Sequence, residues 1–175
     1  MEKYFYIGAI IVASVGAVAD VRSARIPNKL TYTAIASAIL LRAALLGFPG
    51  LKNCGLGILV AGGCFSVLFV LGAIGGGDLK MMTAIGAWVG STHILTVLIA
   101  IGLAGGLLAI TTVIFSKNTI QTVRNTGRLI AYRLNSGLQP HPEMNVQAPG
   151  SRRIPLGLAI AMGTLFCAAN AAWWR

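Results

Sequence analysis

Acidic residues are scarce in this chain, since only four of its 175 residues are aspartate or glutamate. Charged residues of both signs make up 10% of the chain, against about a quarter in a typical soluble domain. Hydrophobic residues make up 56%, and their longest runs approach or exceed the roughly 20 residues that a helix needs to cross a bilayer. These proportions exclude an ordinary soluble domain and indicate an integral membrane protein. Because the apolar residues come in blocks rather than in alternation, a transmembrane barrel is disfavoured.

Cysteine and histidine are also sparse, which argues against a metal site. Cys54, Cys64 and Cys167 are far apart and form no CxxC pair, so neither a zinc site nor a disulfide framework is indicated. We interpret them as small apolar packing residues. His93, expected in a loop at the membrane surface, and His141 have no partners at metal-ligand spacing. We therefore expect no metal and no other cofactor.

Basic residues dominate the charge of the chain, which carries 14 Lys and Arg and a formal net charge of +10. Such a charge can indicate nucleic-acid binding. In a membrane protein, however, basic residues gather on cytoplasmic loops, where they meet anionic lipid. Membrane lipid, and no nucleic acid, is therefore the expected partner of these residues.

The apolar runs predict an all-α polytopic membrane protein with about six transmembrane helices. The predicted helices cover 4–20, 30–46, 54–74, 78–90, 93–115 and 154–174. As one helix, the run 79–115 would be about 55 Å long, nearly twice the hydrocarbon thickness, so we expect a break at 90–93. The whole chain, 1–175, is predicted to be one membrane-embedded domain. Its cytoplasmic loop, 116–153, begins with a basic amphipathic segment on the membrane surface.

The first run could be a signal peptide, because residues 17–19 resemble a cleavage site. However, the charges of Glu2 and Lys3 cancel, and the basic residues Arg22 and Arg25 follow the run instead of preceding it. This asymmetry predicts a retained helix with the amino terminus outside. Beyond it, Pro27 disfavours helix at the preceding residue.

The only two aspartates, Asp20 and Asp78, lie where apolar runs stop. Asp20 ends the first predicted helix and Asp78 begins the fourth, so the two intervening helices return the chain to the same side. If that side is cytoplasmic, it holds ten of the basic residues against four on the other side, as the positive-inside rule favours. Both termini are then outside. An acid at this depth is a functional hypothesis by default.

A pair of aspartates can hydrolyse a peptide bond. Two carboxylates within about 3 Å share a proton. The ionised one can accept a proton from water, while the protonated one stabilises the oxyanion that forms on the scissile carbonyl. Gly75, Gly76 and Gly77 would allow unusual backbone turns before Asp78 and the close approach of an extended peptide.

Other roles for the two acids stay open on the residues alone. Asp78 could cap the fourth helix, and Asp20 could pair with Arg22, Arg25 or Lys80. Both acids could relay protons in a small proton-coupled transporter, although no two-fold internal repeat is obvious. A non-catalytic subunit of a pilus or secretion assembly is a further alternative.

Three stretches of the chain resemble motifs of the prepilin peptidases. Gly75-Gly76-Gly77-Asp78-Leu79-Lys80 resembles their GxGD motif, with the lysine two places on. Asp20-Val21-Arg22, followed by Ile26-Pro27-Asn28 and Thr31, resembles their first catalytic-aspartate motif. Arg153-Ile154-Pro155-Leu156-Gly157, at the start of the last predicted helix, is also similar to that family.

The resemblance implies an inner-membrane aspartic endopeptidase that cleaves the short basic leader from type IV prepilins and pseudopilins on the cytoplasmic side. Asp20 and Asp78 would be its catalytic pair. The small size is most similar to the tight-adherence (Flp) pilus branch or the archaeal preflagellin enzymes. Larger members carry an insert with paired CxxC motifs and also methylate the new amino terminus. Because that insert is missing between the first two predicted helices, we expect no methyltransferase activity, S-adenosylmethionine or zinc.

Seven further residues are expected to support the pair or the approach of substrate. They are Gly75, Gly76, Gly77, Lys80, Arg22, Pro27 and Asn28. Lys80 and Arg22 are expected either to favour the ionised form of a neighbouring carboxylate or to bind lipid headgroups. Asn28 is also expected to cap the second helix.

Overall fold

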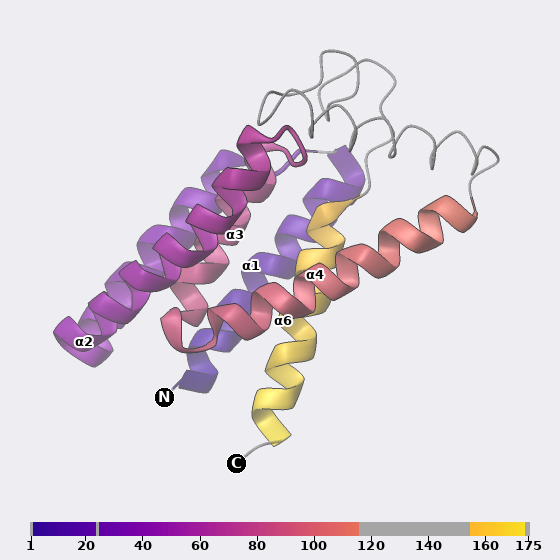
Figure 1. Ribbon diagram of the computed structural model, residues 1–175. Helices are drawn as coiled ribbons and strands as arrows, with labels where there is room; N and C mark the ends of the chain where they lie inside the picture. Colours follow the sequence, from indigo (N-terminus) through magenta and orange to yellow (C-terminus); the bar gives the residue numbers. More distant parts are fainter. Residues whose placement is uncertain (1, 24, 116–154, 174–175) are drawn as a thin grey trace.

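The computed structural model describes residues 2–23, 25–115 and 155–173, and all its regular elements there are helices (Figure 1). These elements are α1 (Glu2–Ser23), α2 (Asn28–Val70), α3 (Gly76–Val89), α4 (Ser91–Ile114) and α6 (Leu156–Trp173). The all-α prediction is therefore confirmed for the described residues. The predicted cytoplasmic loop at 116–153 and its amphipathic segment lie outside them.

The element α2 is a helical hairpin, because the chain reverses at Gly47. Gly47 has φ 61° and ψ −148°, a backbone conformation that is open to glycine without the steric cost of a side chain. A Cβ atom built on Gly50 would lie 2.6 Å from the carbonyl oxygen of Arg42, eight residues earlier, whereas a continuous helix would separate them by about 12 Å. The two helices predicted at 30–46 and 54–74 are thus separated by a reversal of the chain at Gly47.

The second half of α2 runs antiparallel to α3. A Cβ on Gly62 would lie 3.2 Å from the Thr83 hydroxyl oxygen, and a Cβ on Gly76 would lie 3.6 Å from the Phe69 ring. The residue numbers therefore rise along α2 as they fall along α3. This half ends at Val70, earlier than the predicted boundary at residue 74.

Helix α3 lies at the centre of the bundle. Every residue from Ala84 to Val89 is buried. Its 14 residues give a length of about 21 Å, less than the roughly 30 Å of bilayer hydrocarbon. Gly90, with φ 77°, ends the helix and precedes α4. The run 79–115 is therefore broken where predicted, but at Gly90 alone and not over 90–93.

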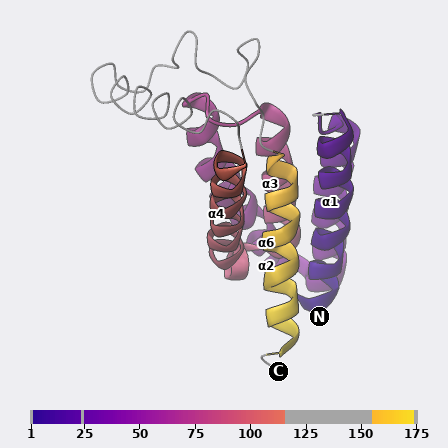
Figure 2. The ribbon, with the colours of Figure 1, turned by 90° about the vertical axis from the view of Figure 1, so that its right-hand side faces the viewer.

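Helix α6 packs against both α1 and α4 (Figure 2). The start of α1 and the end of α6 lie at the same end of the bundle, near the labels N and C in Figure 2. The end of α1 and the start of α6 consequently lie together at the opposite end. This arrangement brings residues near position 20 close to residues near position 157.

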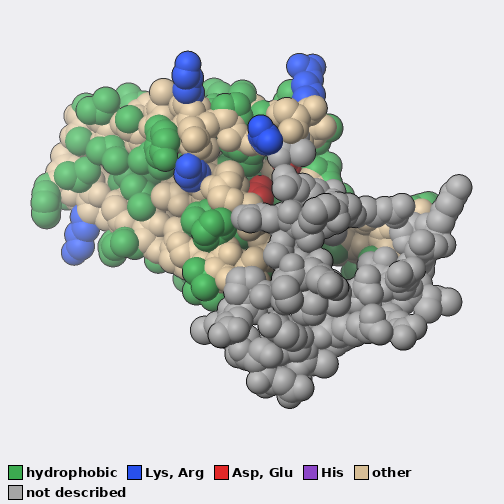
Figure 3. Space-filling model, turned by 90° about the horizontal axis from the view of Figure 1, so that it is seen from above, with side chains coloured by type: hydrophobic (Ala, Val, Ile, Leu, Met, Phe, Trp, Pro, Cys, Tyr) green, Lys and Arg blue, Asp and Glu red, His purple; other side chains and the backbone are tan. Residues whose placement is uncertain are grey.

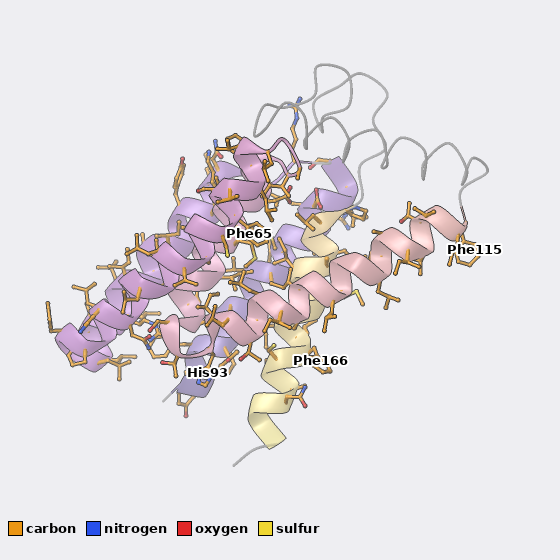
Figure 4. All side chains as sticks on the ribbon, in the orientation of Figure 1. Phe65, His93, Phe115 and Phe166 are labelled. Atoms are coloured by element: carbon orange, nitrogen blue, oxygen red, sulfur yellow. The ribbon has the colours of Figure 1, made fainter. Side chains whose placement is uncertain are left out.

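Three of the described helices, α1, α2 and α4, are long and apolar enough to cross a membrane. Helix α6 contributes a shorter apolar stretch, Leu156–Asn170. Large apolar side chains point away from the bundle: Phe115 is 87% exposed and Phe166 is 65% exposed (Figure 4). Exposed apolar side chains of this size suit contact with lipid chains, since a soluble surface rarely gathers them.

His93 does not lie in a loop, as the sequence suggested, but in the first turn of α4. Its ring lies 5.8 Å from the ring of Tyr6 on α1, measured between centroids, at the end of the bundle where α1 begins (Figure 4). The prediction failed because the turn before α4 needs only Gly90, which leaves the following residues free to be helical. This contact is consistent with a packing role for His93.

Asn53, on the second half of α2, caps the start of α4. Its Oδ1 accepts hydrogen bonds from the Ser91 backbone N–H at 2.7 Å and from the Ser91 hydroxyl at 2.6 Å. The first N–H groups of a helix have no partner within the helix, so a side chain from another element satisfies one here. Asn53 therefore fixes the α3–α4 turn against α2.

We expect Asn53→Ala to lower the free energy of unfolding by about 1 kcal/mol, the typical cost of losing an N-cap. Thermal or detergent-induced unfolding of the purified protein measures this change. Asn170→Ala is the control, because Asn170 is exposed and donates a hydrogen bond to the Phe166 carbonyl of its own helix. Equal stability of the two variants would contradict the capping role.

Candidate active site

Helices α1 and α3 pack against each other in an antiparallel register. Gly8 of α1 faces the ring of Trp88 of α3, and a Cβ on Gly8 would collide with that ring. Eight residues further along α1, a Cβ on Gly16 would lie 2.6 Å from the Met81 sulfur atom. Eight residues on α1 thus correspond to seven on α3, counted in the opposite direction.

This register brings the two aspartates to the same end of neighbouring helices. Asp20 lies four residues beyond Gly16, about one helical turn. Asp78 lies three residues before Met81, on the corresponding turn of α3. Both aspartates are half-buried. The prediction that topology returns both acids to one side agrees with this packing.

Asp20 accepts a hydrogen bond from α6. The backbone N–H of Gly157 donates to its Oδ2 at 2.9 Å. Gly157 is the second residue of α6, where N–H groups have no partner within the helix. The positive end of the helix dipole also favours a carboxylate at this place. The Asp20 carboxylate is therefore bound by a backbone amide.

Asp78 is held by the start of its own helix. Its Oδ2 accepts a hydrogen bond from the Gly75 backbone N–H at 3.2 Å, and Gly75 occupies the N-cap position of α3. Asp78 is therefore not the N-cap residue that the sequence suggested, but it stabilises the start of α3 from the third helical position. This role does not compete with catalysis, because a carboxylate has two oxygens with about four acceptor sites.

The three glycines before Asp78 do not provide the unusual backbone turns that the sequence suggested. The positive φ angles of the described residues lie at Gly47, Gly72 and Gly90, and Gly75 has an ordinary extended φ of −83°. Space is the constraint instead: a Cβ on Gly77 would lie 3.3 Å from the Ile26 Cβ. The expectation of unusual turns at 75–77 is therefore wrong.

Lys80 and Asn28 bind each other across α3 and α2. The Lys80 Nζ donates to the Asn28 Oδ1 at 2.9 Å and lies 5.3 Å from the centroid of the Tyr32 ring. Asn28 does not cap α2: Pro27 holds the N-cap position, and no side chain makes a cap hydrogen bond there. Because Asn28 is the first helical residue, its side chain is available to Lys80.

Arg22 and Pro27 lie nearby on the chain but are exposed, in the last turn of α1 and in the link that follows it. Figure 3 views the bundle from above, where Lys and Arg side chains stand out near a small acidic area. The charged side chains visible on this face are therefore mainly basic. Within the described residues, no group of three or more His, Cys, Asp or Glu side chains could hold a metal ion.

The Lys80–Asn28 bond predicts a measurable coupling between the two side chains. We expect Lys80→Met and Asn28→Ala each to destabilise the protein by about 1 kcal/mol or less, as is usual for a partly exposed hydrogen bond. The double variant should lose little more than either single variant. A double-mutant cycle on detergent-induced unfolding measures the coupling, and strictly additive losses would contradict the bond.

Sequence reasoning missed Gly157 as a partner of Asp20 and Tyr32 as a neighbour of Lys80. Gly157 belongs to a stretch that resembles a prepilin-peptidase motif, but its partner is 137 residues away. Tyr32 lies four residues after Asn28, which places both on one face of a helix. That spacing was a signal that could have suggested a shared contact.

Comparison with known proteins supports one family. No curated protein and no solved structure matches the chain significantly. A model of the Type IV leader peptidase family matches residues 7–110, more than half of the chain, and this segment contains Asp20 and Asp78. The chain therefore belongs to the Type IV leader peptidase family and is an aspartic-type prepilin peptidase.

Proposed function

We propose that Asp20 and Asp78 form the catalytic pair of a membrane-embedded endopeptidase. The observation that supports this most is the α1–α3 register, which places the only two aspartates of the chain at one end of adjacent helices. Each carboxylate also accepts a backbone N–H, from Gly157 and Gly75 respectively. These bonds hold one oxygen of each acid.

In this mechanism, the ionised aspartate accepts a proton from a water molecule while that water attacks the scissile carbonyl carbon. The protonated aspartate donates a hydrogen bond to the carbonyl oxygen and stabilises the negative charge that develops there. Transfer of a proton to the leaving amine then completes cleavage. Because a carboxylate has two oxygens with about four acceptor sites, the hydrogen bonds from Gly157 and Gly75 are compatible with either role.

The proposed substrate is a type IV prepilin or a similar pseudopilin, and family membership implies a substrate of this class. Its apolar helix would lie in the bilayer beside the bundle, so that the leader junction reaches the aspartates. The short link between α1 and α2 leaves no room for the insert of the larger members. We therefore assign the chain to the small, tight-adherence (Flp) type, without methyltransferase activity.

We further propose six membrane crossings in a single domain, with both termini outside and the aspartates at the cytoplasmic face of the inner membrane. The hairpin of α2, the short α3 and the helices α1, α4 and α6 are compatible with six segments. The basic residues near the aspartates, among them Arg22 and Lys80, support this orientation through the positive-inside rule.

The test of this function is cleavage of a model prepilin by the purified protein in liposomes. We expect one cut, at the junction of leader and mature sequence, identified by mass spectrometry of both products. The family resemblance implies a cut just after a glycine, so a prepilin with a bulky residue in place of that glycine is the control substrate and should be cut more slowly. A folded protein that leaves the prepilin intact, or that only carries protons across the membrane, would contradict the proposal.

A further inference from the structure

We propose that Gly157 is a positioning residue for peptide cleavage, and that α6 thereby completes the active site. This inference rests on the proposed role of Asp20 as a catalytic residue. The backbone N–H of Gly157 holds one oxygen of the Asp20 carboxylate. The lack of a side chain at position 157 leaves the space in which that carboxylate lies.

The space at Gly157 is filled by Asp20 itself. A Cβ built on Gly157 would lie 2.8 Å from the Asp20 Cβ and 2.9 Å from the Asp20 Oδ2. Gly157 is buried, and its φ lies outside the left-handed region. Alanine could therefore adopt the backbone conformation at this position. What excludes it is the aspartate side chain.

The start of α6 is suited to hold an acid. Leu158 donates its backbone N–H to the Pro155 carbonyl at 3.1 Å, which closes the first turn. The Gly157 N–H has no acceptor within that turn and points to the Asp20 Oδ2. A hydrogen bond to one oxygen restrains the rotation of the carboxylate and therefore the direction of the second oxygen. That direction decides whether a water molecule can be activated.

The two aspartates depend on different parts of the chain. Asp78 is held by Gly75, three residues away on the same helix, so its position follows α3. Asp20 is held by a helix that follows it by 137 residues and lies outside the segment 7–110 that matches the family. The matched segment holds both acids, but the structure assigns the orientation of one of them to α6.

The test compares three variants of the full-length protein in liposomes: Gly157→Ala, Gly163→Ala and Asp20→Asn. Gly163 is the matched control, because it is also a buried glycine of α6 and its Cβ would lie 2.6 Å from the Ile101 backbone nitrogen. A displacement near 1 Å can reduce a rate about 100-fold. We therefore expect Gly157→Ala to lower kcat about 100-fold with KM little changed. Gly163→Ala should lower thermal stability and leave kcat of the folded protein unchanged.

A second variant removes the donor without adding volume. Glycolic acid in place of Gly157 turns the amide into an ester, which has no N–H. We expect it to lower kcat about tenfold, in line with the loss of one hydrogen bond, with KM little changed. This variant keeps the proposal testable if Gly157→Ala does not fold.

The outcomes separate this inference from the proposed function. If Asp20→Asn stays active, the catalytic role of Asp20 is wrong. If Asp20→Asn is inactive while the ester variant keeps the wild-type kcat, the positioning role of Gly157 is wrong and the proposed function stands. A loss of kcat in Gly163→Ala equal to that in Gly157→Ala would also overturn the inference, because it would show general loosening of α6.

Discussion

Replacing either aspartate by asparagine, as Asp20→Asn or Asp78→Asn, should reduce prepilin cleavage by roughly 10²–10⁴-fold, the range for a lost general acid or base. An amide can neither accept a proton from water nor donate one from a carboxylic acid. It keeps the size of the side chain and an oxygen that can accept the N–H of Gly157 or Gly75. Both variants should therefore fold normally. Mass spectrometry of the cleaved prepilin gives the rate, and circular dichroism reports the fold.

Glu2→Gln is the control for this experiment, because it removes one acid at the opposite end of α1. Its activity should equal that of the wild type. The double variant Asp20→Asn/Asp78→Asn should be no slower than the slower single variant, since residues that act as a unit are not additive in their effects. Full activity in either single variant would refute the catalytic pair. Multiplicative losses in the double variant would show that the two acids act independently.

The sequence alone predicted that Asp20 and Asp78 lie at helix ends on the same side of the bundle. In a hydrophobic membrane protein, a charged residue is expected at the membrane boundary, because burying it in hydrocarbon is costly. Counting the apolar runs between Asp20 and Asp78 therefore gave their common side. The length of the run 79–115 required a break, and the structure has it at Gly90. These predictions needed only lengths and boundaries.

The pairing of α1 with α3 could not be predicted, because it depends on the shapes of side chains far apart in the sequence. Gly8 accepts the ring of Trp88, and Gly16 accepts the side chain of Met81. The chain has 22 glycines, and the local sequence does not indicate which large side chain packs against each of them. The hydrogen bond from Gly157 to Asp20 has the same character.

Local rules also failed where a tertiary contact changed what a residue does. Asparagine is a good N-cap, yet Asn28 lies one residue inside α2 and accepts a hydrogen bond from Lys80 of α3. Glycines in a row suggest unusual turns, yet the φ angle of Gly77 is not positive. Position 77 favours a glycine because Ile26 lies against it. In both cases the reason is the approach of a distant segment.

Helices α2 and α3 approach each other closely at Gly57 and Gly86. A Cβ on Gly57 would collide with the Gly86 carbonyl oxygen and would lie 2.9 Å from the Gly90 Cα. A Cβ on Gly86 would lie 2.8 Å from the Ala61 Cβ. The backbones thus touch without side chains between them, as small residues allow in membranes. The position of α3, and with it that of Asp78, depends on this contact.

We expect Gly57→Leu to lower the free energy of unfolding by about 3 kcal/mol, the upper part of the usual range for overpacking, and to reduce cleavage strongly. A leucine there must push α3 away, and Asp78 moves with α3 relative to Asp20 on α1. Gly63→Leu is the matched control: it lies on the same half of α2, is exposed and has nothing within 4 Å of its Cβ position. Its stability should change by about 0.5 kcal/mol or less.

Detergent-induced unfolding and prepilin cleavage, measured on the same preparations, decide the point. If Gly57→Leu is as stable and as active as Gly63→Leu, the backbone contact between α2 and α3 does not set the position of Asp78. If Gly57→Leu is destabilised but cleaves normally while folded, α3 tolerates displacement, and the distance between the two carboxylates is not fixed by packing at rest. A joint loss would mean that a contact about two helical turns away along the bundle positions one of the two acids, since Gly86 lies eight residues after Asp78 and about 12 Å along the axis of α3.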